Sequence, residues 1–285
     1  MQSDFLIVGG GAVGLTSAIA LLLAGYKVTL VERGNVGQEA SWAGGGILSP
    51  LCSWDYQESV TRLAHRSMAM FAEAAESLHQ ATEIDPEYQR CGMLVLPPFV
   101  EEQARQWCTK YQCPAQSVNV SDYLPTENQP GLLLPDVAQV RNPRWVLALR
   151  KQVEMLGGLI LEQHEVQSFA HEAGRITALQ TKQGKFYADA YIVAAGAWSK
   201  QLLGEHGMRI DIRPIRGQIL LFKFDAPPFQ PIVIKKDLYV IPRRDGHVLV
   251  GSTLEDVGFD KSTTTEARDS LLLRVREIFP DWKNI

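Results

Sequence analysis

The opening 32 residues restrict the fold of this 285-residue chain more than any other segment. Residues 5–8 are apolar, a GGGAVG sequence follows at residues 9–14, and residues 15–24 continue as an apolar segment that ends at a glycine. A second apolar segment then leads directly to Glu32. This order predicts a strand, a tight glycine turn, a buried helix and a second, parallel strand, and therefore an α/β fold with a Rossmann-like domain.

Strand, glycines, helix, strand and acid stand in the order that dinucleotide binding needs. Gly9 permits a tight turn, Gly11 lets a pyrophosphate approach the backbone, and Gly14 lets the helix pack on the strand. The N-terminus of the helix offers N–H groups to the phosphates. Glu32 stands where a carboxylate accepts hydrogen bonds from an adenosine ribose, and it disfavours the 2′-phosphate of NADP. The predicted cofactor-binding residues of this turn are Gly9, Gly11, Ala12, Val13 and Gly14.

The same segment has the length of a membrane span. Residues 5–26 contain no charge over 22 positions, which is enough for a helix to cross a bilayer. However, Asp4 precedes them where a signal peptide has Lys or Arg, and five glycines interrupt them. A buried strand–turn–helix unit explains both the apolar character and the glycine spacing, so we expect no membrane span.

Composition argues against several classes of function. The 28 Lys+Arg and 32 Asp+Glu residues give a net charge of −4, and no basic cluster occurs, so no nucleic-acid partner is expected. The four cysteines have neither the spacing of a zinc site nor that of a disulfide framework. We therefore expect free thiols, no metal site and a cytoplasmic location.

Residues 39–50 read EASWAGGGILSP, and their small side chains would let the backbone pass close to a flat ring. Together with residues 9–14 and the Glu32-Arg33-Gly34 sequence, this segment resembles the FAD-dependent D-amino-acid oxidase family, in particular its glycine oxidases. The resemblance implies that FAD is the cofactor. It also implies FAD contacts from Arg33, Ser41, Gly45, Gly46, Ile47 and Leu48.

Later segments extend the resemblance. Residues 140–143 are expected to open a helix that runs to about residue 156, with Asn142 as its cap and Pro143 in its first turn. After a strand at residues 159–161, the backbone of Val166 matches the family position that meets the adenine. A hairpin is expected at residues 175–188, followed by a strand from residue 189 that ends in small residues. In the family that strand end contacts FAD, here at Ala195 and Gly196.

Residues 213–260 predict short strands at 218–224, 232–235, 238–241 and 247–251, as in the family's antiparallel substrate-binding sheet. The resemblance implies that Tyr239 closes over the substrate. Leu254 lies at a substrate-binding position where glycine oxidases commonly have Met. No arginine matches the family's carboxylate-binding arginine; Arg216 and Arg243 are the nearest substitutes, and Arg243 is expected to face solvent.

The insertion between residues 53 and 135 carries little chemistry. Helices are expected near residues 63–78 and 99–111, and a loop at residues 123–131. One face of the first helix is expected to pack in the core. It consists of Leu63, Met70, Phe71, Ala74 and Leu78. A final helix is expected at residues 266–279, with a cap among residues 262–265.

The predicted architecture is an α/β Rossmann-like FAD-binding domain with an inserted antiparallel β-sheet substrate domain. Residues 1–80 and 140–205 would form the first domain, and residues 81–139 and 206–285 the second. In the family a further segment follows, with the carboxylate-binding arginine and a helix over the flavin. From the resemblance we therefore expect slow turnover by residues 1–285 alone.

The resemblance implies FAD-dependent oxidation of glycine, sarcosine or a small D-amino acid to an imine, with oxygen reduced to hydrogen peroxide, in support of thiamine thiazole synthesis. It implies no catalytic side chain, because the protein orients the substrate and the flavin performs the chemistry. A quinone-linked amino-acid or hydroxy-acid dehydrogenase, an NAD dehydrogenase and a non-catalytic FAD-fold remnant remain alternatives. A homo-oligomer is also left open.

Overall fold

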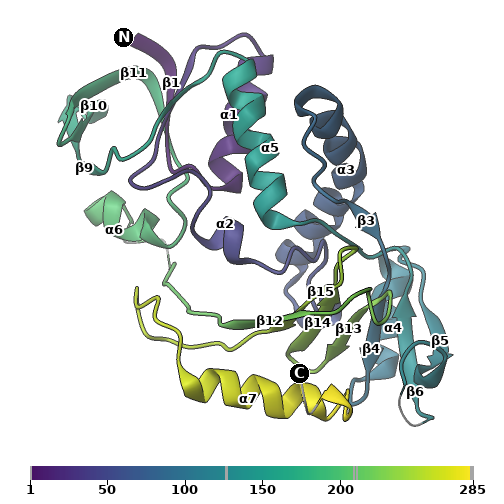
Figure 1. The fold of residues 1–285 in the computed structure, drawn as a ribbon. Coiled ribbons are helices and arrows are strands. Elements are labelled where there is room, and N and C mark those ends of the chain that lie inside the picture. Colours follow the sequence, from purple (N-terminus) through teal and green to yellow (C-terminus); the bar gives the residue numbers. More distant parts are fainter. Residues whose placement is uncertain (1, 126–127, 208, 210, 283–285) are drawn as a thin grey trace. The chain divides into compact units, whose positions relative to one another are not determined.

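The computed structural model describes residues 2–125, 128–207, 209 and 211–282. The chain divides into two compact units, whose elements are labelled in Figure 1. The first unit comprises Met1–Gly44, Glu73–Glu87 and Arg141–Pro214, and the second comprises Gly45–Ala72, Tyr88–Val140 and Ile215–Ile285. This division assigns residues 45–72 to the second unit, whereas the sequence-based boundary at residue 80 assigned them to the first domain.

The first unit contains a six-stranded sheet in the order β8-β2-β1-β11-β10-β9. Strand β1 lies between β2 and β11 and pairs with both in parallel, and β8 pairs in parallel with β2. Its strands are β1 (Gln2–Val8), β2 (Val28–Val31), β8 (Leu159–Leu161), β9 (Val166–Glu172), β10 (Arg175–Thr181) and β11 (Gly184–Val193). Its helices include α1 (Ala12–Leu23), α2 (Ala40–Ala43), α5 (Asn142–Met155) and α6 (Ser199–Leu203). The strand–turn–helix–strand start is therefore confirmed.

Two local predictions for the first unit were wrong. The second hairpin strand and the strand after it form one element, β11, which pairs with β10 at its start and with β1 from Tyr187 onward. No break is needed, because opposite edges of the same strand serve the two partners. Arg141, not Asn142, is the N-cap of α5, and Asn142 is already helical, with Pro143 in the first turn as expected.

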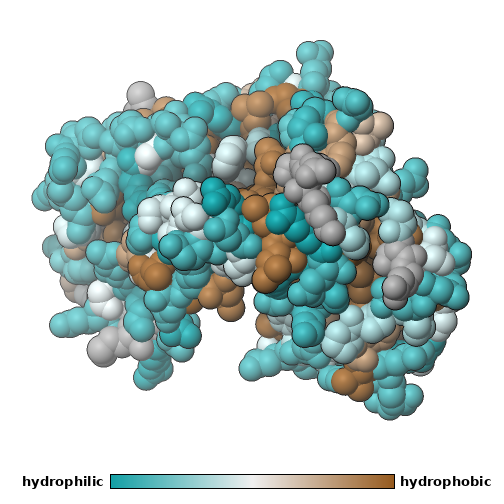
Figure 2. Space-filling model, turned by 60° about the horizontal axis from the view of Figure 1, so that its bottom comes forward, coloured by the Kyte–Doolittle hydropathy of each residue, from teal (hydrophilic) through white to brown (hydrophobic). Residues whose placement is uncertain are grey.

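None of the helices formed by the described residues is both long enough and apolar enough to cross a membrane. Residues 5–26 instead supply most of β1, the glycine turn and α1. The apolar character of this segment is explained by burial, because Ile7 and Leu15 are both fully buried. Figure 2 shows hydrophilic residues over much of one face of the molecule, with hydrophobic residues between them.

The second unit contains a seven-stranded sheet in the order β12-β15-β14-β13-β4-β6-β5. All neighbouring strands are antiparallel except β13 and β4, which are parallel. The prediction of an antiparallel sheet was therefore wrong for this one pair. The strands are β4 (Met93–Leu96), β5 (Gln116–Asn119), β6 (Pro130–Leu134), β12 (Ile219–Lys223), β13 (Ile232–Lys235), β14 (Leu238–Pro242) and β15 (His247–Gly251). A separate pair consists of β3 (Gln89–Arg90) and β7 (Ala138–Gln139).

Both faces of this sheet are apolar, and β4 shows why. Its side chains alternate, so Leu94 and Leu96 join the core that contains α7 (Thr265–Arg276), while Met93 and Val95 join the core that contains α4 (Glu101–Lys110). A strand buried on both faces needs a continuous apolar sequence, here MLVL. The four free cysteines all belong to the α4 side of the sheet: Cys52, Cys91, Cys108 and Cys113.

Helix α3 (Glu58–Thr82) differs from its predicted packing. Leu78 is buried, but Leu63 and Met70 are 73% and 60% exposed. The buried positions instead include Thr61 and Thr82. The hydroxyl of Thr82 donates to the carbonyl of Leu78 at 2.6 Å, so a polar residue is buried without losing a hydrogen bond. The prediction was therefore wrong for Leu63 and Met70, whereas Leu78 is buried and Phe71 and Ala74 are half-buried.

Replacing Leu271 tests the core on the α7 side. Leu271 is 1% exposed, so Leu271→Ala is expected to lower the free energy of unfolding of the second unit by about 2–5 kcal/mol. Denaturant unfolding followed by tryptophan fluorescence measures this change. Leu273→Ala is the matched control, because Leu273 lies on the same helix but is 67% exposed. Equal losses in the two variants would contradict the described packing of α7.

Candidate cofactor and substrate sites

The glycine turn after β1 is possible only without side chains at two positions. Gly9 has a φ of +110°, and a Cβ there would lie 2.4 Å from the carbonyl oxygen of Ala194. A Cβ on Gly14 would lie 1.9 Å from the carbonyl oxygen of Gly9. Such distances are below any real contact, so α1 can begin this close to the end of β1 only because both residues are glycine.

The N-terminus of α1 presents unused hydrogen-bond donors. Gly11 is the N-cap, and Ser41 accepts the N–H of Ala12 at 2.9 Å. Within the described part of the chain, the N–H groups of Gly11 and Val13 have no acceptor. A Cβ on Gly11 would meet only the Ser41 hydroxyl, at 3.1 Å. Donors at a helix N-terminus with open space beside them suit an anionic group such as a pyrophosphate.

Glu32 holds the glycine turn by hydrogen bonds. Its side chain is buried, one carboxylate oxygen accepts the N–H of Gly10 at 2.7 Å, and the other accepts the N–H of Gly34 at 2.9 Å. Each oxygen keeps a second lone pair for a ribose hydroxyl. Glu32 therefore fixes the loop after β2 against the glycine turn, a structural role that the sequence motif did not reveal.

Arg33 is held by its own unit. Its guanidinium contacts the Glu39 carboxylate at 2.8 Å, and its Cζ lies 3.6 Å from the centroid of the Trp198 ring. Trp198 follows Ala195 and Gly196, so Arg33 connects two segments that the resemblance assigned to FAD. Val166 begins β9 and packs, half-buried, against the local core.

Glu162 was not identified from the sequence, yet it holds the loop that follows Glu32. Its carboxylate accepts the N–H of Val36 at 2.7 Å and pairs with both terminal nitrogens of Arg150 at 3.0 Å. The only sequence signal was an acid directly after the short strand β8. Charge-assisted bonds of this kind fix the backbone near Glu32 more firmly than neutral ones do.

In the second unit, residues 45–48 lie along β7. The N–H of Val140 donates to the carbonyl of Gly46, and the N–H of Leu48 donates to the carbonyl of Ala138, both at 2.9 Å. Ile47 forms a bridge with Gln139 between these two bonds. An isolated β-bridge and two backbone hydrogen bonds therefore hold the segment that the resemblance assigned to FAD against β7.

Arg243 holds the same segment, and its predicted exposure was wrong. The residue is 5% exposed, and its guanidinium donates to the carbonyl of Gly45 at 2.7 Å. It also donates to the Gln139 side chain at 2.7 Å and to the carbonyl of Val140 at 2.8 Å. The sequence did contain a signal, because the two-residue period of a strand places Arg243 on the same face as Tyr239.

Tyr239 lies close to that segment. A Cβ on Gly45 would be 3.4 Å from the Tyr239 ring, and a Cβ on Gly251 would be 2.6 Å from the Tyr239 hydroxyl. Both glycines therefore leave room for the ring. Burial raises the pKa of Tyr239, and a hydrogen bond with Ser252 opposes this effect. The predicted substrate tyrosine and Gly45 are thus neighbours in one unit.

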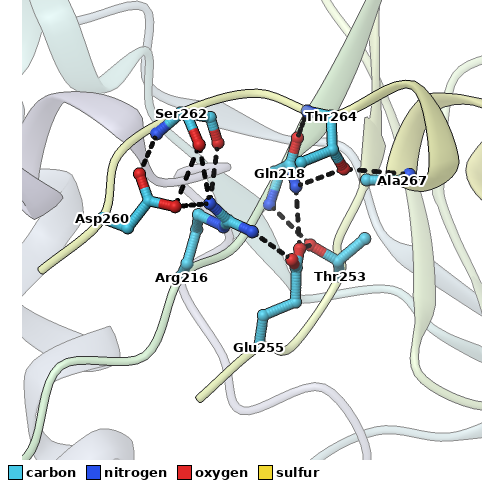
Figure 3. A network of polar contacts seen from close by, with 8 residues as sticks. All are labelled: Arg216, Gln218, Thr253, Glu255, Asp260, Ser262, Thr264 and Ala267. Atoms are coloured by element: carbon cyan, nitrogen blue, oxygen red, sulfur yellow. Dashed lines mark hydrogen bonds and ion pairs between the residues drawn. The ribbon is translucent and has the colours of Figure 1, made fainter. Parts of the chain in front are cut away.

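Leu254 is 85% exposed, on a loop whose backbone is anchored on both sides. Figure 3 shows this anchoring: the Arg216 guanidinium pairs with Glu255 at 2.6 Å and with Asp260 at 2.7 Å. The carbonyl and N–H of Arg216 also form a backbone bridge with Glu255. Arg216 and Arg243, the two nearest substitutes for a carboxylate-binding arginine, are therefore both committed to internal contacts.

Gln218 extends the network to the start of α7 (Figure 3). Its side chain donates to Glu255 at 2.8 Å and accepts the N–H of Thr264 at 2.8 Å. Thr264 in turn caps α7 by accepting the N–H of Ala267 at 3.2 Å. The loop that carries Leu254 is thus tied to β12 and to a helix terminus.

Comparison with known proteins decides the family. Residues 4–285 match the family described as FAD dependent oxidoreductase (DAO). The chain belongs to this family. It is an FAD-dependent oxidoreductase, and the predicted fold class and cofactor are confirmed.

Several relatives are similar over nearly the whole chain. A glycine oxidase of Pseudomonas aeruginosa is 40% identical over 99% of this chain and 79% of that protein. A bifunctional protein ThiO/ThiG of a Synechocystis species is 33% identical over 98% of this chain and 43% of that protein. The crystal structure of a glycine oxidase from Geobacillus kaustophilus matches with a TM-score of 0.91 and 26% identity, over 98% of this chain and 79% of that one.

The residues of the first unit fit the ADP part of FAD. Free N–H groups at Gly11 and Val13 suit the pyrophosphate, and the spare lone pairs of Glu32 suit ribose hydroxyls. Glycine at position 11 leaves open the space that a side chain would fill. Which residues touch FAD stays a prediction, and the following substitution tests it.

Gly11→Val is expected to weaken FAD binding by at least tenfold, because the branched side chain would occupy the space beside the free N–H groups. Titration of the purified apoprotein with FAD, followed by flavin fluorescence, measures the dissociation constant. Ala20→Val is the control, because Ala20 is exposed near the other end of α1. Unchanged affinity in Gly11→Val would remove this turn from the FAD site.

The Glu255 network predicts a pH effect on stability. Hydrogen bonds from Thr253, Arg216 and Gln218 lower the pKa of Glu255 from 4.5 to about 2. The folded state therefore binds this proton more weakly than the unfolded state does, and the stabilisation is complete above pH 4.5 and is lost as the pH falls toward 2. Glu255→Gln should remove this contribution.

The melting temperatures of the parent chain and Glu255→Gln should thus differ above pH 5 and converge as the pH approaches 2 to 3. Thermal unfolding followed by circular dichroism at a series of pH values measures the difference. Glu102→Gln is the control, because Glu102 is an exposed helical carboxylate bonded to the neutral Gln106. A difference between parent and Glu255→Gln that is independent of pH would contradict the network.

Proposed function

We propose that this chain oxidises glycine, sarcosine or a small D-amino acid in an FAD-dependent oxidase reaction. The observation that carries the proposal is the closeness of Tyr239 to Gly45, because it brings the predicted substrate tyrosine beside the segment assigned to the flavin. Two glycine oxidases of Pseudomonas species, 40% and 39% identical to the chain, support it.

The proposed roles follow from the chemistry of each residue. When bound, FAD supplies the hydride acceptor for oxidation of the amine carbon, and oxygen then receives the electrons as hydrogen peroxide. Gly11, Val13 and Glu32 hold the ADP part, while residues 45–48 hold the flavin. Tyr239 and Leu254 border the substrate. No side chain needs to move a proton, since orientation is the main requirement.

The proposed biological role is thiamine thiazole synthesis in the cytoplasm. The sequence resemblance implied this role, and the similarity to bifunctional ThiO/ThiG proteins supports it. The product that such a pathway would consume is the imine formed from glycine.

The proposal is tested by incubating the FAD-loaded full chain with glycine or sarcosine. Anaerobic addition of the amine should bleach the visible flavin absorbance, and air should restore it with formation of hydrogen peroxide in a peroxidase-coupled assay. Bleaching by the amine that is reversed by a quinone but not by oxygen would establish the dehydrogenase instead. No bleaching by any small amine or hydroxy acid would contradict an amino-acid oxidase.

Tyr239→Phe should lower kcat/KM for the amine about 2- to 13-fold, which corresponds to the loss of one hydrogen bond of about 0.5–1.5 kcal/mol. Tyr187→Phe is the matched control, because Tyr187 is an exposed strand tyrosine of the first unit. Steady-state peroxide production at several amine concentrations gives both parameters. Equal effects of the two substitutions would remove Tyr239 from the proposed substrate site.

A further inference from the structure

Arg243 is a buried cation that forms several hydrogen bonds with groups distant in the sequence. Its side chain is 5% exposed and donates to the oxygens of Gly45, Gln139 and Val140 at 2.7, 2.7 and 2.8 Å. Burying a charge is costly unless hydrogen bonds replace its hydration. Two of these acceptors are backbone carbonyls, so the guanidinium fixes and polarises peptide groups.

The peptide group between Gly45 and Gly46 is the important one. Arg243 binds its carbonyl oxygen, and in a planar trans peptide the N–H points in the opposite direction. Among the described residues, the N–H of Gly46 has no acceptor, whereas the carbonyl of Gly46 accepts from Val140. A charge-assisted bond to the carbonyl increases the donor strength of the N–H on the other side, because hydrogen-bonded groups polarise one another.

We infer that Arg243 is a positioning residue that acts on the bound flavin through the Gly45–Gly46 peptide, holding the Gly46 N–H as a strengthened donor and raising the reduction potential of FAD. The inference rests on the proposed function, which places residues 45–48 against the flavin. Two-electron reduction increases the electron density of the flavin ring, so a polarised donor at the ring favours the reduced state. Arg243 would then promote amine oxidation without touching the amine.

Gln139 orients the guanidinium of Arg243. Its side-chain oxygen accepts from Arg243, and its nitrogen donates to the carbonyl of Pro242 at 2.9 Å. Gln139 is itself 1% exposed and lies in β7, opposite Ile47. It therefore orients the guanidinium toward Gly45 while remaining neutral, and a carboxylate in its place would offset the charge.

The midpoint potential of the bound flavin tests the inference, measured by equilibration with reference dyes in the FAD-loaded full chain. Arg243→Met should lower the potential by about 30 mV, a tenfold change in the ratio of reduced to oxidised flavin for a two-electron couple. Arg243→Lys keeps the charge but cannot reproduce the planar fork, so its potential should lie between those of the parent and Arg243→Met. Arg244→Met is the control, because the neighbouring Arg244 is exposed and donates to the carbonyl of Tyr88.

Gln139→Glu keeps the inference testable if Arg243→Met does not fold. It should lower the potential although Arg243 is still present, because the carboxylate offsets the guanidinium charge. Unchanged potentials in the folded Arg243 and Gln139 variants would overturn the inference, even if FAD affinity or melting temperature fell, since that pattern marks a purely structural role. Failure of the parent chain to be reduced by any amine would instead contradict the proposed function, before any variant is compared.

Discussion

The close approach of α1 to the end of β1 is the constraint on which the first unit depends. The chain can turn there only because neither Gly9 nor Gly14 has a side chain, since a Cβ on Gly14 would overlap the carbonyl oxygen of Gly9 at 1.9 Å. This contact sets the helix N-terminus directly at the edge of a parallel sheet. Backbone N–H groups without acceptors, which secondary structure normally uses up, are thereby left for a ligand.

Glycines let other groups come close to the backbone, but they have no side chain that could fix the backbone by packing. In each unit a buried charged side chain fixes the glycine-rich segment instead. In the first unit the Glu32 carboxylate collects the N–H groups of Gly10 and Gly34. In the second unit the Arg243 guanidinium collects the carbonyls of Gly45 and Val140. A carboxylate can fix a glycine-rich backbone by accepting hydrogen bonds from its N–H groups. A guanidinium can do so by donating hydrogen bonds to its carbonyl groups.

The sheet of the second unit explains how the proposed substrate-binding residue Tyr239 can lie on a sheet whose two faces both pack in cores. Strand β14 directs Val240 into the core that contains α7, while Tyr239 and Ile241 point to the other face, the α4 side. On that side Gly45 and Gly251 leave room for the tyrosine ring. The network around Arg216 holds the neighbouring loop, so the exposed side chain of Leu254 extends from a fixed backbone.

The sequence by itself determined what depends on neighbours in the chain. The glycine turn, the parallel strands beside it and most strands between residues 218 and 251 follow from spacing and alternation, and the FAD family follows from motifs of a few residues. Strands β4, β5 and β6 were not predicted, because they are short and form only by pairing with other strands. Strand β4, for example, pairs with β13, which lies more than 130 residues away in the sequence. The exposure of Leu63 and Met70 was missed for a related reason, since periodicity defines a helix face but not what packs on it.

Only the tertiary structure decided the role of Arg243. An arginine beside a turn is expected to be exposed to solvent. Arg243 is buried instead, because it donates to acceptors that lie about 100 and 200 positions away in the sequence. The cost of burying its charge is met only when all of these oxygens converge. Local patterns specify which elements form, whereas convergence of distant backbone groups on one charge is a property of the folded chain alone.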